Sequence, residues 1–389
     1  MNRRDFVSGA ALAAGCLPAQ ALAAHGLTGQ AYAAKSPAEA APVYTERTVE
    51  LTGDTAPASE AWMAQELVRL VAKYGKVSDA YLAGGAIADL ERMMAEKLGK
   101  EDAVFMPTGT LANNIAVRLL CGEKRHAIAQ HESHLYRDES DAFALLSGLN
   151  LVPLGKDKTF PAYEEIAAAI DEAEHGPYPI AVGAISIESP VRRMHGAYVP
   201  YAEVERVAKM AREHGIGLHL DGARLFLLSG IEGFEMKPYC ALFDTVYISL
   251  YKYLGSPFGA LLAGTKERMV QARELRHSYG GLIRHGWEAA LPALDSLPGF
   301  ADRFAKARME WEKLLAGLQA AGGFTVTRVE NGSNIAFVDG SDARMKGLPD
   351  RMAKADVHVR VGEKNRMLVS VNESILRRSA EELIRVFAG

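Results

Sequence analysis

The sequence has few cysteines, no dense basic stretch, no internal repeat and no apolar run long enough for a permanent membrane span. Only three of its 389 residues are cysteines, which is too few for a scaffold built on disulfides. Lysine and arginine number 44 against 48 aspartates and glutamates, and they do not cluster as nucleic-acid binding requires. Histidines, cysteines and carboxylates show no spacing typical of metal ligands. We therefore expect no disulfide scaffold, no nucleic-acid partner and no metal.

The composition is that of a globular chain with a large core. Hydrophobic residues make up 49% of the sequence, and its length suits one large α/β domain followed by a smaller one. We place a large domain with its N-terminal segment over residues 46–290 and a small C-terminal domain over residues 291–389. Apolar residues at helical spacing predict helices near residues 60–74, 86–98, 163–174, 201–214 and 301–321.

Two short segments in the middle of the chain carry the strongest functional signal. Apolar residues 216–220 predict a buried strand that ends at Asp221, and residues 245–250 predict another that ends just before Lys252. Open α/β sheets bind ligands at the carboxyl ends of their strands. Pyridoxal phosphate needs a lysine amine for its aldehyde and a carboxylate that keeps its pyridine nitrogen protonated. Asp221 and Lys252 are the candidates, although either residue alone is more often an ordinary turn or loop residue.

The residues after Lys252 predict a reversal of strand direction. Gly255, Pro257 and Gly259 mark a short loop before the apolar run at residues 260–263. A parallel crossover needs a dozen residues or more, so this loop favours an antiparallel return strand. We expect a mostly parallel sheet with one antiparallel strand, and the lysine at the reversal.

A second candidate site lies at the start of a predicted helix. Residues 104–106 form a short apolar strand, and a helix is expected to begin near Thr110, directly after Thr108 and Gly109. The first N–H groups of a helix lack partners and its N-terminus is positive, so this end can bind a phosphate. An ordinary helix cap is the alternative.

Together these segments resemble the threonine aldolase and β-eliminating lyase family of fold-type I pyridoxal phosphate enzymes. The resemblance extends over about residues 51–371. It implies an α/β large domain with a mostly parallel sheet and a small α+β C-terminal domain. Further matching residues, in the family's order, are Leu90-Glu91, the run from Phe105 to Asn113, Ser133-His134 with Glu139, and Gly280-Gly281 with Arg284.

The resemblance also implies roles for individual residues. Arg284 would reach the phosphate of a neighbouring subunit, so a homodimer or homotetramer with shared active sites is expected. His134 would stack on the cofactor ring and act near the substrate side chain. The expected catalytic residues are Lys252, His134 and Asp221. The expected cofactor-binding residues are Thr108, Gly109, Thr110, His134, Asp221, Arg224, Lys252 and Arg284. The expected substrate-binding residues are Tyr81 and two carboxylate-binding arginines, Arg224 and Arg366.

Several positions depart from the family pattern, and these departures concern the substrate pocket. Tyr251 stands where a serine usually precedes the lysine, and residues 82–85 replace an acidic stretch. Gly53 replaces a serine of the substrate pocket. The family's Glu-Asn-Thr-His signature begins here at Glu188, but Val191 replaces its histidine. Without that histidine, His134 or a water would have to act as the base, or the reaction would be a different cleavage such as elimination.

The N-terminus has the layout of a twin-arginine signal peptide. Paired arginines Arg3 and Arg4 precede an Ala-rich apolar run, and small residues suggest cleavage after Ala23. We expect residues 1–23 to be a signal, residues 24–45 a linker, the twin-arginine export machinery a partner, and the mature protein periplasmic. A lipid anchor on Cys16 is the alternative.

The sequence thus predicts a pyridoxal phosphate-dependent lyase with a small amino acid as substrate. As the resemblance implies, it would cleave the Cα–Cβ bond of a β-hydroxy-α-amino acid to give glycine and an aldehyde. The alternatives are β-elimination or other chemistry at Cα and, from a different class, a catalytically silent binding protein that keeps the fold.

Overall fold

The computed structural model describes residues 44–389, which form one compact unit. The expected signal at residues 1–23, Cys16 within it, and nearly all of the expected linker at residues 24–45 lie outside the described residues. No helix within residues 44–389 combines the length and apolar character needed to cross a lipid bilayer.

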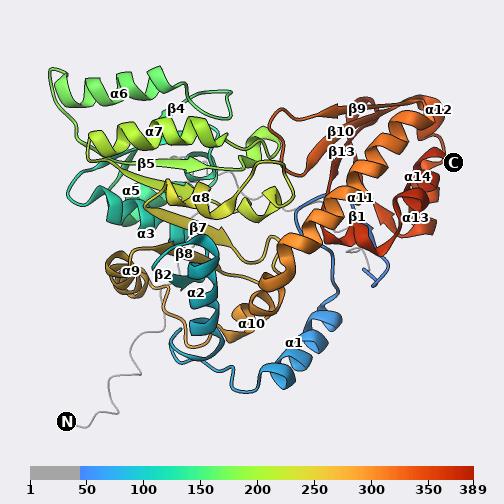
Figure 1. The fold of residues 1–389 in the computed structure, drawn as a ribbon, viewed down its shortest axis with the longest axis horizontal. Coiled ribbons are helices and arrows are strands. Elements are labelled where there is room, and N and C mark those ends of the chain that lie inside the picture. Colours follow the sequence, from blue (N-terminus) through green and yellow to red (C-terminus); the bar gives the residue numbers. More distant parts are fainter. Residues whose placement is uncertain (1–43) are drawn as a thin grey trace, which may run out of the picture. The chain divides into compact units, whose positions relative to one another are not determined.

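A seven-stranded sheet forms the centre of the larger part of this unit, in the order β2-β8-β7-β6-β5-β3-β4 (Figure 1). Strand β8 runs antiparallel to both of its neighbours, whereas the other pairs are parallel. The predicted mostly parallel sheet with one antiparallel strand is therefore confirmed. The strands are β2 (Asp102–Met106), β3 (His126–Gln130), β4 (Asn150–Leu154), β5 (Val182–Glu188), β6 (Gly217–Asp221), β7 (Thr245–Ser249) and β8 (Ala260–Gly264).

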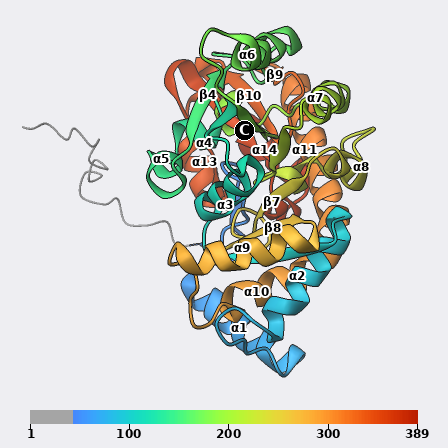
Figure 2. The ribbon, with the colours of Figure 1, turned by 90° about the vertical axis from the view of Figure 1, so that its left-hand side faces the viewer.

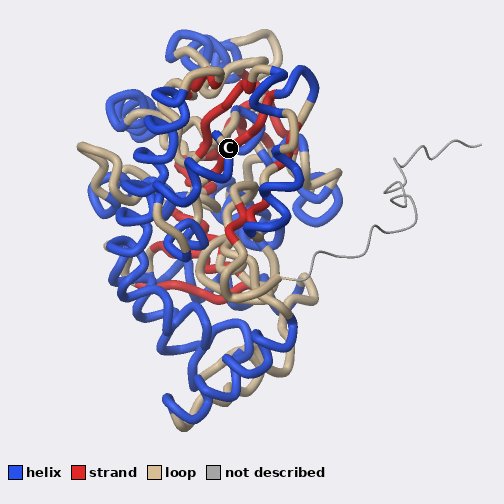
Figure 3. Tube along the Cα trace, turned by 90° about the vertical axis from the view of Figure 1, so that its right-hand side faces the viewer, coloured by secondary structure: helices blue, strands red, loops and turns tan. Residues whose placement is uncertain are grey.

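Helices cover both faces of this sheet, which explains why its strands are apolar throughout. Alternate residues of β2 show the two faces: Phe105 packs in one core cluster with Leu90 of α2 (Gly85–Leu98). Met106 packs in another cluster with Ile115 of α3 (Gly109–Cys121). Helix α9 (Lys266–Ser278) lies beside α3, as Figure 2 shows. Helices surround the strands in Figure 3 as well.

The five helices predicted from apolar spacing are confirmed, with bounds within one residue at each end. The α-helices whose bounds have not yet been given, the predicted ones included, are α1 (Glu60–Tyr74), α4 (His134–Arg137), α5 (Ala142–Ser147), α6 (Tyr163–His175), α7 (Tyr201–Glu213), α8 (Met236–Ala241), α10 (Trp287–Ser296), α11 (Phe300–Ala321), α12 (Asp342–Met345), α13 (Leu348–Ala355) and α14 (Ala380–Ala388).

The C-terminal part contains a four-stranded antiparallel sheet in the order β12-β13-β10-β9. Helix α11 leads from the large sheet to this small one and packs on α14 and β9 (Figure 1). The α/β fold with a small α+β C-terminal part is thereby confirmed. The strands are β9 (Phe324–Arg328), β10 (Ile335–Gly340), β12 (Arg360–Val361) and β13 (Arg366–Ser370).

The N-terminal segment belongs with the C-terminal part in space. Strand β1 (Val49–Glu50) pairs in parallel with β11 (Val357–His358), although we expect it in the large domain from sequence. The expected domain boundary, between residues 290 and 291, falls inside α10. β1 and β11 form a separate two-stranded sheet, and from β1 the chain runs on to Thr55, whose hydroxyl contacts the backbone of Tyr251 and Lys252.

Candidate functional site

Lys252 lies in the turn that follows β7, at the wall of a cavity of about 1030 Å³. Burial and, second to it, the positive charge of Arg224 lower the pKa of its amine to about 8. The opposing effect of the Asp221 carboxylate is smaller. A lysine with such a pKa is partly neutral near pH 7, which is the form that attacks an aldehyde.

Asp221 ends β6 and is 1% exposed. One of its carboxylate oxygens accepts a hydrogen bond from the Asn113 side-chain amide (3.0 Å), and the other accepts from the Ala223 backbone (3.1 Å). Asn113 also donates to Glu139 (2.8 Å). Since Asn113 comes from α3, the helix that starts at the candidate phosphate site also fixes the carboxylate that would face the pyridine nitrogen.

His134 begins α4 and is held at two points. Its backbone N–H donates to Glu188 (2.6 Å), and its Nδ1 lies 2.8 Å from the Glu139 carboxylate. Burial alone would lower the pKa of His134, but the hydrogen bond with Glu139 outweighs burial and the net pKa is raised. With Nδ1 committed to Glu139, Nε2 is left for exchanging a proton. The neighbouring His131 instead pairs with Glu132 and lies outside the cavity lining.

Glu188 ends β5 directly beside Asp221 in the parallel register. Burial and the negative charge of Asp221 raise the pKa of Glu188 to about 7. Its two oxygens accept from the backbone N–H groups of His134 and Arg192. Val191, which replaces the family histidine, is fully buried. Arg192 lines the cavity and pairs with Asp138.

The start of α3 forms the candidate phosphate site. Thr108 caps the helix by accepting from the Leu111 backbone (3.2 Å). A methyl group on Gly109 would overlap the hydroxyl of Tyr247 and lie 2.6 Å from that side chain's ring carbon Cζ. Glycine is therefore required here by the buried Tyr247 of β7. Ser249, two residues further along the same face of β7, has a buried hydroxyl that finds no hydrogen-bond partner within residues 44–389.

These residues fit pyridoxal phosphate. The Ser249 hydroxyl and one Glu139 oxygen are buried without partners in the described part of the chain, as expected of polar groups that face a bound ligand. Lys252 suits the aldehyde, Asp221 the pyridine nitrogen, and the N-terminus of α3 the phosphate. His134, Glu139 and Asp221 also place three potential ligand atoms within 4.8 Å of one another, a grouping that could hold a cation, but Asn113 already bonds both carboxylates.

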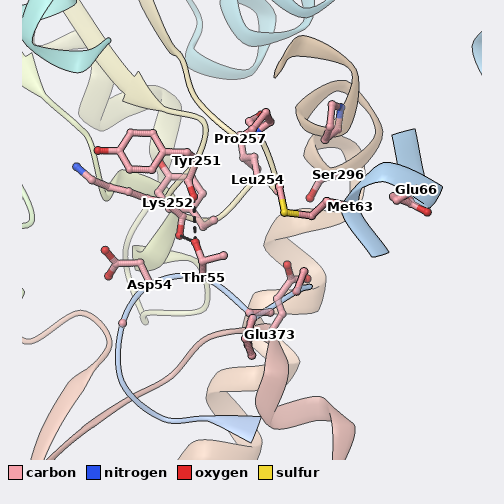
Figure 4. Close-up of a pocket in the computed structure, with 18 of the residues that line it drawn as sticks. Asp54, Thr55, Met63, Glu66, Tyr251, Lys252, Leu254, Pro257, Ser296 and Glu373 are labelled. Atoms are coloured by element: carbon pink, nitrogen blue, oxygen red, sulfur yellow. Dashed lines mark hydrogen bonds between the residues drawn. The ribbon is translucent and has the colours of Figure 1, made fainter. Parts of the chain in front are cut away.

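Arg224 lies at this cavity, but its partner is a residue that the sequence did not identify. Its Nε donates to the carboxylate of Asp54 (2.8 Å), and both side chains are largely buried. Thr55, the next residue, donates through its hydroxyl to the backbone carbonyls of Tyr251 (3.0 Å) and Lys252. Figure 4 shows Asp54 and Thr55 directly beside Tyr251 and Lys252.

Of the expected site residues, Lys252, His134 and Arg224 line this cavity. Asp221 and the helix-start residues Thr108, Gly109 and Thr110 lie outside its lining, as do Tyr81, Arg284 and Arg366. Arg366 forms an exposed pair with Asp339, with distances of 2.8 and 2.9 Å from its Nε and Nη2, and packs on the ring of Phe337. Arg366 is therefore not brought to the site expected for a substrate carboxylate. Tyr81 and Arg284 are both exposed and are joined by a backbone hydrogen bond (2.8 Å).

Tyr251, which precedes the lysine, is 46% exposed and lines the cavity. The Lys252 Nζ lies 5.8 Å from the centre of its ring. Sequence reasoning missed Tyr247, although a tyrosine in a buried strand usually has a polar partner for its hydroxyl. No local pattern marks Asp54 and Asn113 as contacts of Arg224 and Asp221, because these pairs are joined only by the fold.

Comparisons with known proteins agree with this geometry. The family model described as β-eliminating lyase matches residues 50–341. The probable low-specificity L-threonine aldolase 2 of Arabidopsis thaliana is 30% identical over 321 residues, covering 79% of this chain and 88% of that protein. The alanine racemase TOXG of Cochliobolus carbonum is 33% identical over 215 residues, 54% of each chain. The solved threonine aldolase of Leishmania major shares the fold, with a TM-score of 0.69, 21% identity, and coverage of 87% of this chain and 97% of that one.

Proposed function

Since this chain belongs to the β-eliminating lyase family, we propose that it is a pyridoxal phosphate-dependent lyase that cleaves a β-hydroxy-α-amino acid to glycine and an aldehyde. The observation that carries the proposal is the meeting of Lys252, Asp221 and His134 at the carboxyl ends of the strands. The lysine is half-buried with a lowered pKa, the carboxylate is fixed, and the imidazole is held by its own carboxylate partner.

The protein's part in the reaction is to bind, orient and move protons. When bound, pyridoxal phosphate supplies the electron sink for the charge that develops at Cα. Lys252 provides the amine for its aldehyde, and Asp221 keeps a proton on its ring nitrogen. The N-terminal amides of α3 bind the phosphate, with Gly109 allowing close approach.

His134 is the proposed base for the β-hydroxyl, in place of the histidine that Val191 replaces. Its Nδ1 is bonded to Glu139, so Nε2 would take the proton. Because the pKa of His134 is raised, a larger fraction of its ring is protonated near neutral pH than in an ordinary histidine. The cleavage should therefore proceed faster on the alkaline side of neutrality.

A second candidate is other chemistry at Cα, namely elimination or proton exchange. The altered position Val191 favours this alternative, because no histidine there can take the β-hydroxyl proton. A relative named as an alanine racemase shows that the resemblance extends beyond aldolases. The two candidates differ in products, so product analysis separates them.

We also propose how the chain is delivered and assembled. The arginine pair Arg3-Arg4 and the apolar run after it support twin-arginine export to the periplasm with cleavage after Ala23. Arg284 is exposed and outside its own chain's cavity lining, which supports a homodimer or homotetramer in which it binds a neighbour's phosphate.

The purified protein should be yellow with bound cofactor and should lose this colour in the variant Lys252→Ala. With L-threonine it should release glycine and acetaldehyde. Release of keto acid and ammonia without glycine would show that the reaction is β-elimination and not aldol cleavage. Exchange of the Cα proton alone would indicate a racemase. A colourless protein that does not take up added pyridoxal phosphate would refute the enzyme and leave a silent binding protein.

A further inference from the structure

Asp54 forms a buried ion pair with Arg224 at the edge of the cavity that Lys252 lines. The Arg224 Nε lies 2.8 Å from an oxygen of Asp54, and the two side chains are 13% and 16% exposed. Burial would lower the pKa of Arg224, but the Asp54 carboxylate, with smaller contributions from the charges of Glu188 and Asp221, outweighs burial and raises it. The pair is therefore a fixed feature of the cavity wall, unlike the exposed ion pairs on the surface.

The hydrogen bond to Asp54 uses only one side of the guanidinium group. Among the described residues, Arg224 makes a single side-chain hydrogen bond, through Nε. A guanidinium has five N–H donors in a planar fork, so the four on its two terminal nitrogens remain available. Two parallel N–H donors are what a carboxylate binds in bidentate fashion. Asp54 can thus hold Arg224 while the same arginine binds a second carboxylate.

The segment that carries Asp54 is fastened on both sides. The backbone N–H of Gly53 donates to the Ser370 hydroxyl (3.4 Å), and its carbonyl accepts from Asn372 (3.3 Å), both from the C-terminal part. On the other side, Thr55 bonds the carbonyl of Lys252 itself. Asp54 therefore sits in a segment that ties the small sheet to the lysine turn (Figure 4). A group held in this way orients its partner without further loss of conformational freedom.

Charge balance supports the same role. Without Asp54, the Arg224 guanidinium would lose its ion-pair partner, with the charges of Glu188 and Asp221 left to balance it, and removing one partner of a largely buried pair is costly. The positive charge of Arg224 lowers the pKa of Lys252, whereas the negative charge of Asp54 raises it. Asp54 thus limits how far Arg224 perturbs the lysine, and it leaves Arg224 oriented for an incoming anion.

We propose that Asp54 is the positioning residue that aims Arg224 at the α-carboxylate of the substrate, and so restricts the site to amino acids with a free carboxylate. This inference rests on the proposed function. The opposite role would be competition, in which Asp54 occupies the place of the substrate carboxylate and must be displaced. The two roles predict opposite changes in affinity when the charge of Asp54 is removed.

The test compares Asp54→Ala and Asp54→Asn, both loaded with cofactor. Binding of glycine is followed by the change in cofactor absorbance, with methylamine as a probe that lacks a carboxylate. For Asp54→Ala, we expect the Kd of glycine to rise roughly tenfold or more, the effect of losing an interaction with a charged group. Methylamine should bind as before. Asp54→Asn, which keeps a hydrogen-bond acceptor, should recover part of the glycine affinity.

Asp102→Asn is the matched control, since Asp102 also pairs with an arginine (Arg273, 2.7 Å) but does not line the cavity. It should leave both Kd values unchanged. Tighter binding of glycine to the Asp54 variants would establish competition and overturn positioning. Positioning would also be overturned if the Kd values of glycine and methylamine were both unchanged, or if both rose by the same factor. A wild-type protein without cofactor colour would instead refute the proposed function.

Discussion

The pKa of Lys252 makes a quantitative prediction about how the protein takes up its cofactor. With a pKa of about 8, about 9% of this amine is neutral at pH 7, against ~0.03% for a lysine with the ordinary value of 10.5. The neutral amine is the reactive form, so Lys252 should react with an aldehyde about 300 times faster at this pH than an exposed lysine of equal access.

The physical cause of this shift can be tested by changing its sources. Burial is the largest source and the charge of Arg224 is the second. Arg224→Gln removes the second source alone, so the pKa of Lys252 should rise without reaching the ordinary value. Asp54→Asn removes a carboxylate that raises the pKa of Lys252, and it should therefore lower that pKa.

The assay is the rate at which cofactor-free protein acquires colour from added pyridoxal phosphate, measured from about pH 6 to pH 10. Because the amine must lose its proton, the rate should rise with pH and level off above about pH 8 for the wild type. The midpoint should move to higher pH in Arg224→Gln and to lower pH in Asp54→Asn. A wild-type midpoint near the ordinary lysine value of 10.5 would refute the reasoning.

Two further predictions concern stability. Gly109→Ala should destabilise the fold by about 1–3 kcal/mol, because the added methyl overlaps Tyr247, and should weaken cofactor binding. Thermal unfolding of Gly109→Ala, alone and combined with Tyr247→Phe, checks this prediction. If the two changes in the free energy of unfolding simply add, the contact between the new methyl and the Tyr247 hydroxyl is contradicted. Burial lowers the pKa of His219 to about 4, so stability should fall by about 2 kcal/mol from pH 7 to pH 5, as only the unfolded chain gains this proton. Denaturant unfolding of wild type and His219→Gln checks this, and equal pH dependence would count against it.

Much of the fold and part of the site could be read from local patterns. Buried strands of the expected period, the short loop between Lys252 and residue 260, and the helix start after Thr108 predicted the mixed sheet and placed Lys252, Asp221 and Gly109 at its ligand-binding edge. These features depend on a few neighbouring residues, since strand ends, glycine turns and helix caps are encoded locally.

The expected role of Arg366 shows where local patterns stop. A short arginine-containing strand resembles the family pattern, but β10 places Asp339 opposite Arg366 in the antiparallel register. The two side chains therefore form an ion pair with each other, away from the cavity. Register across strands is set by packing of the whole small sheet. No inspection of residues 366–371 alone could show it.

The sequence by itself therefore predicted Lys252 and Asp221 as the candidate cofactor residues, and the strands that present them, because strand ends and turns are encoded in short stretches of the chain. The tertiary structure alone decided which groups hold them: Asp54 on Arg224, Asn113 on Asp221, and Tyr247 against Gly109. These partners lie 170, 108 and 138 positions apart in the chain, as 224 − 54, 221 − 113 and 247 − 109. Only the packing of distant elements brings such pairs within hydrogen-bonding or van der Waals distance, and that contact sets the charge and shape of the site.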